Sequence, residues 1–362
     1  MTKPDKALHK VLVCPRTREP LEYVSLDTEA GFLCPATGVL YPVIDGIIIM
    51  APITDDVKKL CLAFFKRQSG ALTILGGQFS INETFKALSL VTLAETIDWS
   101  SEEMRYWEQR FEKQLKDSDW GRTGWNRTLP RQKLLERLPE EVHRKVILEI
   151  GCGGASTLYD VYGETIEKYI GLDLSFNACR LAKRLFPKGL IIQASAESLP
   201  LKTESVDLIV AYGVLHHLPH HEQQLTVFLP ILKPGGFFIG SDPVLKPRIP
   251  RPRLLRKESV STGAYSSDRH LETGMSPHNE WIDWDNLLAI IKDRAQLVDA
   301  LFEYSPLRHV LVSLLNNRLG IHSKAVAKLL IDLDRMWLAT VGKLSRKLGP
   351  GGVIYTLKRT GR

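Results

Sequence analysis

A regular alternation of short apolar strands and helical stretches after residue 130 constrains the fold of this chain most strongly. Strands alternating with helices form right-handed βαβ units, whose strands lie parallel in one sheet. The second half of the chain is therefore predicted to be an α/β domain. The strand candidates are 146–150, 169–172, 190–193, 206–211, 237–240, 295–304 and 352–358.

A glycine cluster directly follows the first of these strands. Gly151 and Gly153 allow a sharp turn and let a ligand approach the backbone closely. Glu149 places a carboxylate at the strand end. Asp173 ends the next strand 22 residues after Gly151, a spacing at which an acid can accept hydrogen bonds from ribose hydroxyls. For the glycine pair taken alone, a tight turn with no ligand is an equally good interpretation.

Three further segments follow at regular intervals: 195–200 after the third strand, 212–219 after the fourth and 232–236 before the fifth. With these, residues 130–242 resemble the class I S-adenosylmethionine-dependent methyltransferases. The resemblance implies a Rossmann-like, mostly parallel seven-stranded sheet with helices on both faces. The cofactor-binding residues that it implies are Glu149, Gly151, Cys152, Gly153, Asp173, Leu174, Ser195, Ala196, Glu197, Tyr212 and His217.

Two positions depart from the family pattern. Ala155 stands where the family often has a third glycine, and Ser195 stands where it often has an aspartate. A fold that binds a nicotinamide dinucleotide is the main competing interpretation. Its fingerprint requires Gly or Ala where this chain has Ser156. The Lys-Pro-Gly-Gly turn at 233–236 also favours the methyltransferase interpretation.

Methyl transfer from a sulfonium needs mostly positioning and exclusion of water, and a base only when the acceptor arrives protonated. We expect His278 to be that base, with His217 beside the cofactor as the second catalytic candidate. His216 is expected to pack or to cap the following helix. The basic segment 246–257 carries six positive charges and no acid, which favours an anionic acceptor. The candidate substrate-binding residues are Asp242, Arg248, Arg251 and Glu280.

Residues 12–50 carry a second resemblance, to the small zinc-ribbon-like module that serves as activator subunit of tRNA and release-factor methyltransferases. That family has two Cys-x-x-Cys pairs, but here Thr17 and Thr37 replace the second cysteine of each pair. Cys14 and Cys34 alone do not make a structural zinc site, which needs four ligands. We therefore predict that no metal is bound, and that the module is kept for packing.

We expect the chain to consist of three parts. Residues 1–54 form the small β-rich module, 55–128 a helical linker and cofactor cover, and 129–362 the methyltransferase domain, with a helical lid inserted at about 306–346. Five widely spaced cysteines, no signal peptide and no long apolar run predict a cytoplasmic protein without a transmembrane segment. The oligomeric state is left open.

The sequence thus predicts an enzyme that transfers a methyl group from S-adenosylmethionine to a small-molecule, glycan or lipid-precursor acceptor. A net charge of +7 permits an anionic partner without requiring one. An RNA methyltransferase acting on rRNA or tRNA is the alternative, although nucleic acid is not favoured because the basic segment lacks interleaved aromatics. A catalytically silent protein that binds the cofactor or acts in protein interactions is the alternative of another class. Contact with a membrane surface through amphipathic helices stays open.

Overall fold

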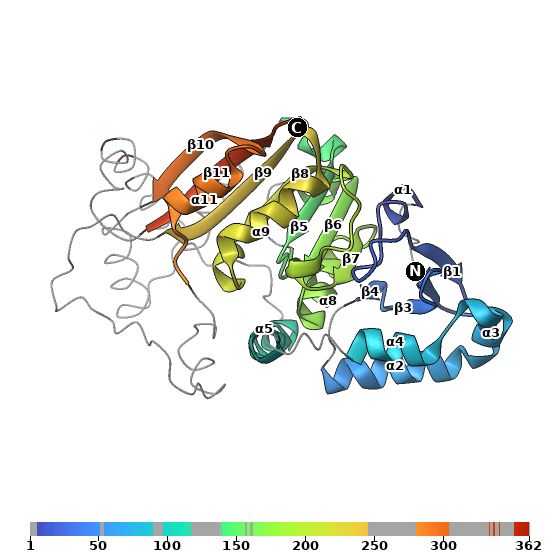
Figure 1. Cartoon of the computed structure of the whole chain (residues 1–362). Helices are drawn as coiled ribbons and strands as arrows, with labels where there is room; N and C mark the ends of the chain where they lie inside the picture. The colour runs from blue at the N-terminus through green and yellow to red at the C-terminus, as the bar shows by residue number, and fades with distance from the viewer. Residues whose placement is uncertain are drawn as a thin grey trace.

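The computed structural model describes residues 6–50, 54–89, 97–116, 138, 140–155, 158–159, 162–244, 280–303, 333, 336, 340 and 351–361. Within these residues a single mixed sheet runs across the molecule (Figure 1). Its strands are β1 (Glu22–Ser25), β2 (Ala30–Cys34), β3 (Val39–Ile44), β4 (Ile47–Ile49), β5 (Val146–Ile150), β6 (Lys168–Asp173), β7 (Leu190–Gln193), β8 (Val206–Tyr212), β9 (Leu232–Val244), β10 (Ala295–Glu303) and β11 (Gly351–Arg359).

Helices pack on this sheet along its whole width. In Figure 1, α9 and α11 lie in front of the later strands, while α2 and α4 lie beside the N-terminal ones. The α-helices are α1 (Lys6–His9), α2 (Asp55–Arg67), α3 (Ser69–Ile74), α4 (Ile81–Ser89), α5 (Ile97–Lys116), α8 (Phe176–Leu185), α9 (His221–Phe228) and α11 (Trp284–Ile291). Short 3-10 turns are η1 (Gly76–Gln78), η2 (Val142–Arg144), η3 (Gly163–Thr165), η4 (Ala196–Ser198), η5 (Leu215–His217) and η6 (Leu229–Ile231).

The strand order is β1-β2-β3-β4-β7-β6-β5-β8-β9-β11-β10. From β5 the chain builds outward through β6 and β7, and then returns to β8 on the other side of β5. The order therefore reverses between β5 and β8. In open α/β sheets, ligands bind outside the carboxyl ends of the strands at such a reversal. This places the expected site at the ends of β5, β6 and β8.

The expected count of seven mostly parallel strands is wrong for the sheet as a whole. The described residues contribute eleven strands, and the pairings within β1–β4 and on both sides of β11 are antiparallel. The cause is that β4 pairs in parallel with β7, with Ile48 opposite Ile192, so the N-terminal module extends the central sheet. The expected lid at 306–346 lies outside the described residues apart from three isolated positions.

The N-terminal module is also tied to the loop after η4. The backbone N–H of Val13 donates to the carbonyl of Pro200 at 3.0 Å, and the hydroxyl of Ser198 donates to the carbonyl of Pro15 at 2.9 Å. The guanidinium of Arg18 donates to the carbonyls of Leu199 and Leu201. These bonds fix the loop that follows the third strand of the α/β part.

Replacing Arg18 with alanine is expected to lower the free energy of unfolding by about 1 kcal/mol, because two charge-assisted hydrogen bonds to backbone carbonyls are lost at a solvent-exposed residue. Urea denaturation measures the change. Arg16→Ala, at an exposed neighbouring position, serves as the control and is expected to stay within about 0.5 kcal/mol of the unsubstituted protein. Equal stability of the two variants would contradict the role given to Arg18.

The two cysteines of the module are fully buried within it. The Sγ of Cys14 lies 3.2 Å from the hydroxyl of Tyr41, and the Sγ of Cys34 lies 3.8 Å from the hydroxyl of Thr17. Among the described residues no group of three or more His, Cys, Asp or Glu side chains is arranged to hold a metal ion. The thiols here bond to hydroxyls of the module itself, so the metal-free module stays our prediction.

Candidate functional site

The turn after β5 is the centre of the candidate site. Gly151, Gly153 and Ala155 all adopt left-handed backbone, with φ of 60°, 52° and 58°. A Cβ atom on Gly151 would lie 2.5 Å from the Cγ2 of Val214, so no side chain fits there. Ala155 takes the same left-handed conformation that a third glycine would, at a cost of about 1–2 kcal/mol. The departure from the family pattern at 155 therefore leaves the shape of the turn unchanged.

Two acids predicted from the sequence stand beside this turn. Glu149 is 2% exposed and accepts a hydrogen bond from the Tyr169 hydroxyl at 2.6 Å. Asp173, at the end of β6, accepts from the backbone N–H groups of Gly153 and Ser175, both at 2.8 Å. Burial raises the pKa of Asp173 to about 6, against the hydrogen bonds that lower it. Asp173 thus links the glycine turn to the end of the neighbouring strand.

The remaining expected cofactor residues line the same edge. Cys152 is buried, and burial raises the pKa of its thiol, so it stays neutral. The hydroxyl of Ser195 caps η4 by accepting a hydrogen bond from the N–H of Glu197 at 3.2 Å. Ala196 is buried and Glu197 is half-exposed. Burial also raises the pKa of Glu197. Leu174 and Tyr212 are half-exposed at the ends of β6 and β8.

Helix α5 lies over the turn and supplies contacts that the sequence did not reveal. The carboxylate of Glu108 accepts from the Ser175 hydroxyl at 2.5 Å and from the backbone N–H of Asn177 at 3.2 Å, at the start of α8. The Phe111 ring is packed against Gly153, where an added Cβ would come within 3.2 Å of it. Helix α5 therefore contacts both the glycine turn and the start of α8, and a cofactor cover at 55–128 stays a prediction.

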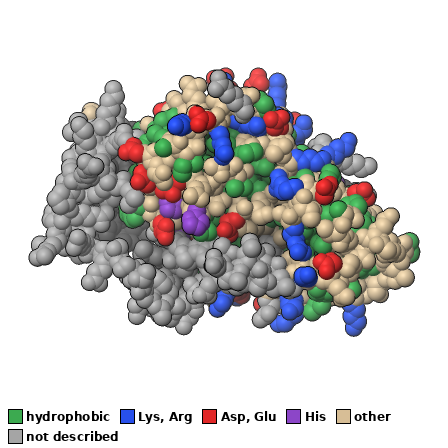
Figure 2. Space-filling view, viewed as in Figure 1, with side chains coloured by type: hydrophobic (Ala, Val, Ile, Leu, Met, Phe, Trp, Pro, Cys, Tyr) green, Lys and Arg blue, Asp and Glu red, His purple; other side chains and the backbone are tan. Residues whose placement is uncertain are grey.

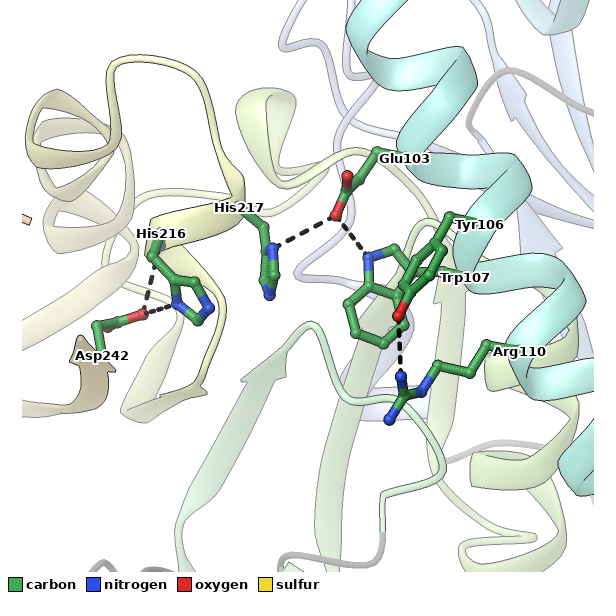
Figure 3. A network of polar contacts seen from close by, with 7 residues as sticks. All are labelled: Glu103, Tyr106, Trp107, Arg110, His216, His217 and Asp242. Atoms are coloured by element: carbon green, nitrogen blue, oxygen red, sulfur yellow. Dashed lines mark hydrogen bonds and ion pairs between the residues drawn. The ribbon is translucent and has the colours of Figure 1, made fainter. Parts of the chain in front are cut away.

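Two histidines of η5 are each held by a buried carboxylate (Figure 3). The Nδ1 of His216 lies 2.9 Å from Oδ1 of Asp242, at the end of β9. The Nδ1 of His217 lies 3.4 Å from Oε1 of Glu103 on α5, and this same oxygen accepts from the indole N–H of Trp107 at 2.7 Å. The two imidazole centroids are 3.9 Å apart. The contact between His217 and Glu103 therefore links helix α5 to the edge of the sheet.

Several residues predicted from the sequence cannot be placed. His278, Arg248 and Arg251 lie outside the described residues. Glu280 is described: its side chain is exposed, 3.7 Å from the Nδ1 of His221, and its backbone N–H donates to the carbonyl of His216 at 3.0 Å. Asp242, predicted to bind substrate, is buried, and its Oδ1 lies 2.9 Å from the Nδ1 of His216.

Charge on the described surface is mixed. On the face shown in Figure 2, Lys and Arg side chains are scattered, and histidine side chains lie beside acidic ones. In the part of the chain that the structure describes, no helix is both long enough and apolar enough to cross a bilayer.

Comparisons with known proteins support both resemblances. The family model described as "Methyltransferase domain" matches residues 148–240, and the model described as "Trm112p-like protein" matches residues 5–46. The resemblance of these two segments to the methyltransferases and to the small activator module is confirmed. The first match begins in β5 and ends in β9, so it contains the glycine turn, Asp173 and both histidines.

Two curated relatives are proteins of Mycolicibacterium smegmatis. One, named "Probable S-adenosylmethionine-dependent methyltransferase", is 32% identical over 111 residues, covering 30% of this chain and 42% of its own length. A fatty-acid O-methyltransferase is 33% identical over 109 residues, covering 28% of this chain and 38% of its own. The chain thus spans about two fifths of the length of the curated relatives that it matches.

Among solved structures, a complex between the Haloferax volcanii Trm112 methyltransferase activator and a methyltransferase overlaps 72% of this chain and 97% of that one. The identity is 14% and the TM-score is 0.42.

Proposed function

We propose that this chain is an S-adenosylmethionine-dependent methyltransferase that acts on a small-molecule or lipid-precursor acceptor. The observation that carries the proposal is the left-handed glycine turn at the reversal of strand order, linked by hydrogen bond to the Asp173 carboxylate. Residues of this kind suit the cofactor, because a turn without side chains lets a ligand meet the backbone and an acid can accept from ribose hydroxyls.

The cofactor, when bound, supplies a methyl group on a sulfonium, which is already activated for transfer. The chain's own residues then position the cofactor and keep water away from it. The turn at 151–155 seats the methionine part, Asp173 holds the ribose, and Ala196 and Glu197 flank the adenine. Helix α5 keeps water out, since Phe111 packs on Gly153 and Glu108 binds the start of α8.

One relative and one charged segment of the sequence indicate the acceptor class. A fatty-acid O-methyltransferase is among the relatives, and this favours a lipid-type acceptor. The positive segment 246–257 favours an anionic group on it. We therefore place the chain with enzymes that methylate small or lipid-like acceptors.

Calorimetric titration of the purified protein with S-adenosylmethionine, S-adenosylhomocysteine and NAD tests the proposal. Micromolar binding of the first two ligands and no binding of NAD is the expected result. Failure of a folded protein to bind either sulfur ligand would overturn the proposal and favour a catalytically silent protein.

Asp173 gives this binding a pH dependence. Its pKa of about 6 means that the carboxylate is ionised above that pH and protonated below it. Only the ionised form accepts from both ribose hydroxyls, so affinity is expected to be full at pH 7 and to fall toward pH 5, by up to about tenfold for each pH unit below 6. Titration of the unsubstituted protein at several pH values measures this.

The variant Asp173→Asn distinguishes the titration of Asp173 from unfolding of the protein at low pH. The variant is expected to bind S-adenosylmethionine at least about tenfold more weakly at pH 7, with an affinity that no longer changes between pH 7 and pH 5. Circular dichroism at both pH values controls for unfolding. A variant that keeps the pH dependence would show that another group causes it.

A further inference from the structure

We propose that α2 and α3 form a docking surface for an anionic lipid bilayer, at which the enzyme meets its acceptor. The bilayer is a partner beyond the proposed methyltransferase function, and it rests on that function only for its purpose. Three observations carry the proposal. The two helices share one exposed face, apolar and basic side chains meet on that face, and the helix leaves the sheet at the edge of the candidate site.

Helices α2 and α3 form one amphipathic helix with a kink at Gln68. Backbone hydrogen bonds continue across the kink, from the N–H of Gln68 to the carbonyl of Phe64 at 3.0 Å and from the N–H of Leu72 to the carbonyl of Gln68 at 2.9 Å. The side chains of the inner face are buried at helical spacing: Val57, Cys61, Phe64, Phe65, Gln68 and Leu72. The opposite, outer face consists of exposed residues: Lys58, Lys59, Leu62, Lys66, Thr73 and Ile74.

The outer face exposes large apolar side chains. Ile74 is 85% exposed, more than any other exposed large apolar side chain in the described part of the chain, and Leu62 is 46% exposed. Ile74 also stands at a tip, because Gly76 and Gly77 follow it and a Cβ on either glycine would meet no atom within 4 Å. Such a tip can enter the headgroup region of a bilayer without breaking contacts inside the protein.

The lysines of the outer face surround this apolar surface. Lys58 and Lys66 lie four residues before and four residues after Leu62, so all three share one side of the helix. Their long stems can lie along the apolar surface while the ammonium groups reach lipid phosphates. Figure 2 shows Lys and Arg side chains projecting from the lower right of the molecule, where Figure 1 places α2 and α4. The face therefore matches an anionic headgroup layer in charge.

Nearby acids leave this positive excess in place. Lys59 lies 3.2 Å from Asp56, but both side chains are more than three quarters exposed, and such a pair is easily exchanged for another partner. Arg67 is held by Glu29 at 2.7 Å, so we do not count it in the outer face. The charge that faces a bilayer is then supplied by the lysines.

The helix leaves the sheet at the edge of the candidate site. Strand β4 runs parallel to β7, and the N–H of Met50 donates to the carbonyl of Gln193 at 2.8 Å. Gln193 lies opposite Asp173 of β6, so β4 ends at the edge where the cofactor is proposed to bind. Helix α2 begins just beyond, with Thr54 as its cap. In Figure 1, α2 and α5 lie along the same lower side of the sheet. Docking by this helix would bring that edge to the bilayer, where a lipid-type acceptor resides.

Apolar insertion and charge attraction must act together here. One exposed isoleucine gives only weak partitioning, and each lysine near an anionic surface strengthens binding by about fivefold. Salt screens the second contribution. Binding is therefore expected to need both the anionic lipid and the apolar tip, and to weaken as salt rises.

Flotation of the full chain with lipid vesicles tests the proposal. One set of vesicles contains equal parts of phosphatidylglycerol and phosphatidylcholine, and the other contains phosphatidylcholine alone. The unsubstituted protein is expected to float with the first set at low salt, about 0.05 M. Its partition coefficient should be at least about tenfold lower at about 0.5 M salt and on phosphatidylcholine alone.

Variants at exposed positions locate the surface. Lys58→Glu with Lys66→Glu is expected to lower the partition coefficient by about 25-fold or more, and Ile74→Gln by about fivefold. The controls Lys188→Glu and Val298→Gln change an exposed lysine after α8 and an exposed apolar residue of β10, and both should stay within about twofold. Circular dichroism and S-adenosylmethionine affinity should be unchanged in all of them.

Other outcomes would overturn the proposal. They are absence of binding to phosphatidylglycerol vesicles, or equal binding by the double lysine variant and the unsubstituted protein. Binding of tRNA that this variant loses, without vesicle binding, would assign the face to nucleic acid. A dimer that Ile74→Gln dissociates, without vesicle binding, would assign it to a second copy of the chain. Vesicle binding without S-adenosylmethionine binding would instead count against the methyltransferase function alone.

Discussion

Gly151→Ala is expected to weaken S-adenosylmethionine binding by about 5- to 30-fold while leaving the chain folded. The backbone of Gly151 has a φ of 60°, where a residue with a Cβ costs about 1–2 kcal/mol. The added Cβ would also lie 2.5 Å from a methyl carbon of Val214. In the free protein the turn can relax away from both strains. Binding requires the original turn, so the ligand must restore it at the expense of affinity.

Calorimetry measures the affinity for S-adenosylmethionine. Two further variants identify the cause of a lower affinity. Gly70→Ala is the matched control, because a Cβ there would meet no atom within 4 Å and the residue lies inside helix α3. The double variant Gly151→Ala, Val214→Ala removes the close contact but keeps the left-handed strain, so we expect partial recovery. Unchanged affinity in Gly151→Ala would show that the cofactor does not bind at this turn.

The strands of the α/β part could be predicted well because their sequences are short, apolar and bounded by polar turns. The predicted bounds of β5 and β7 agree with the structure, and the other strands differ mainly in length. Strand β9 extends on both sides of the expected 237–240, because it continues across the Lys-Pro-Gly-Gly turn and as far as Asp242 and Val244. Pairing with β11 stabilises the extension from Ser241 to Val244, and local sequence does not reveal such a partner.

The joining of the N-terminal module to the central sheet could not be predicted. Strand β3 contains Pro42, which is unusual inside a sheet, so 39–44 does not read as a strand. In the structure Pro42 lies opposite Gly31 of β2 on one side, and on the other side β4 pairs only with Val43 and Ile44. The three isoleucines of β4 signal burial on both faces, but nothing in their sequence says that β7 is the partner.

Some residues of the candidate site could likewise be predicted from the sequence, and others could not. The glycines and Asp173 follow a strand directly, so sequence order alone brings them to one sheet edge. Glu103 and Glu108 come from a distant helix, and only tertiary packing brings them to His217 and Ser175. The contact of His216 with Asp242 likewise depends on the neighbouring ends of β8 and β9, which local sequence does not reveal.

Ile48→Asp is expected to destabilise the whole chain, and not only its N-terminal module, by about 3–5 kcal/mol, because it places an unpaired charge in a closed core. Ile48 is 2% exposed and pairs with Val43 on one side and with Ile192 of β7 on the other. A charge there disturbs the module and the α/β sheet together. The loss is therefore expected in a single cooperative unfolding transition.

Tryptophan fluorescence makes this coupling measurable. All seven tryptophans lie between residues 99 and 337, outside the module, so their signal reports on the rest of the chain. Urea unfolding of Ile48→Asp should shift the fluorescence and circular dichroism transitions to the same lower midpoint. Val298→Asp, on edge strand β10 at a side chain 53% exposed, is the matched control and is expected to change stability by less than about 1 kcal/mol.

A module that folds independently of the α/β part would give the opposite result. If the module folded independently, Ile48→Asp would remove part of the circular dichroism signal and leave both the tryptophan transition and S-adenosylmethionine binding unchanged. Coupled loss would instead mean that β4 supports β7, whose neighbour β6 ends at Asp173. The N-terminal module would then stabilise the edge of the sheet at Asp173 through the sheet itself. This gives a physical reason for the two segments to be carried on one chain.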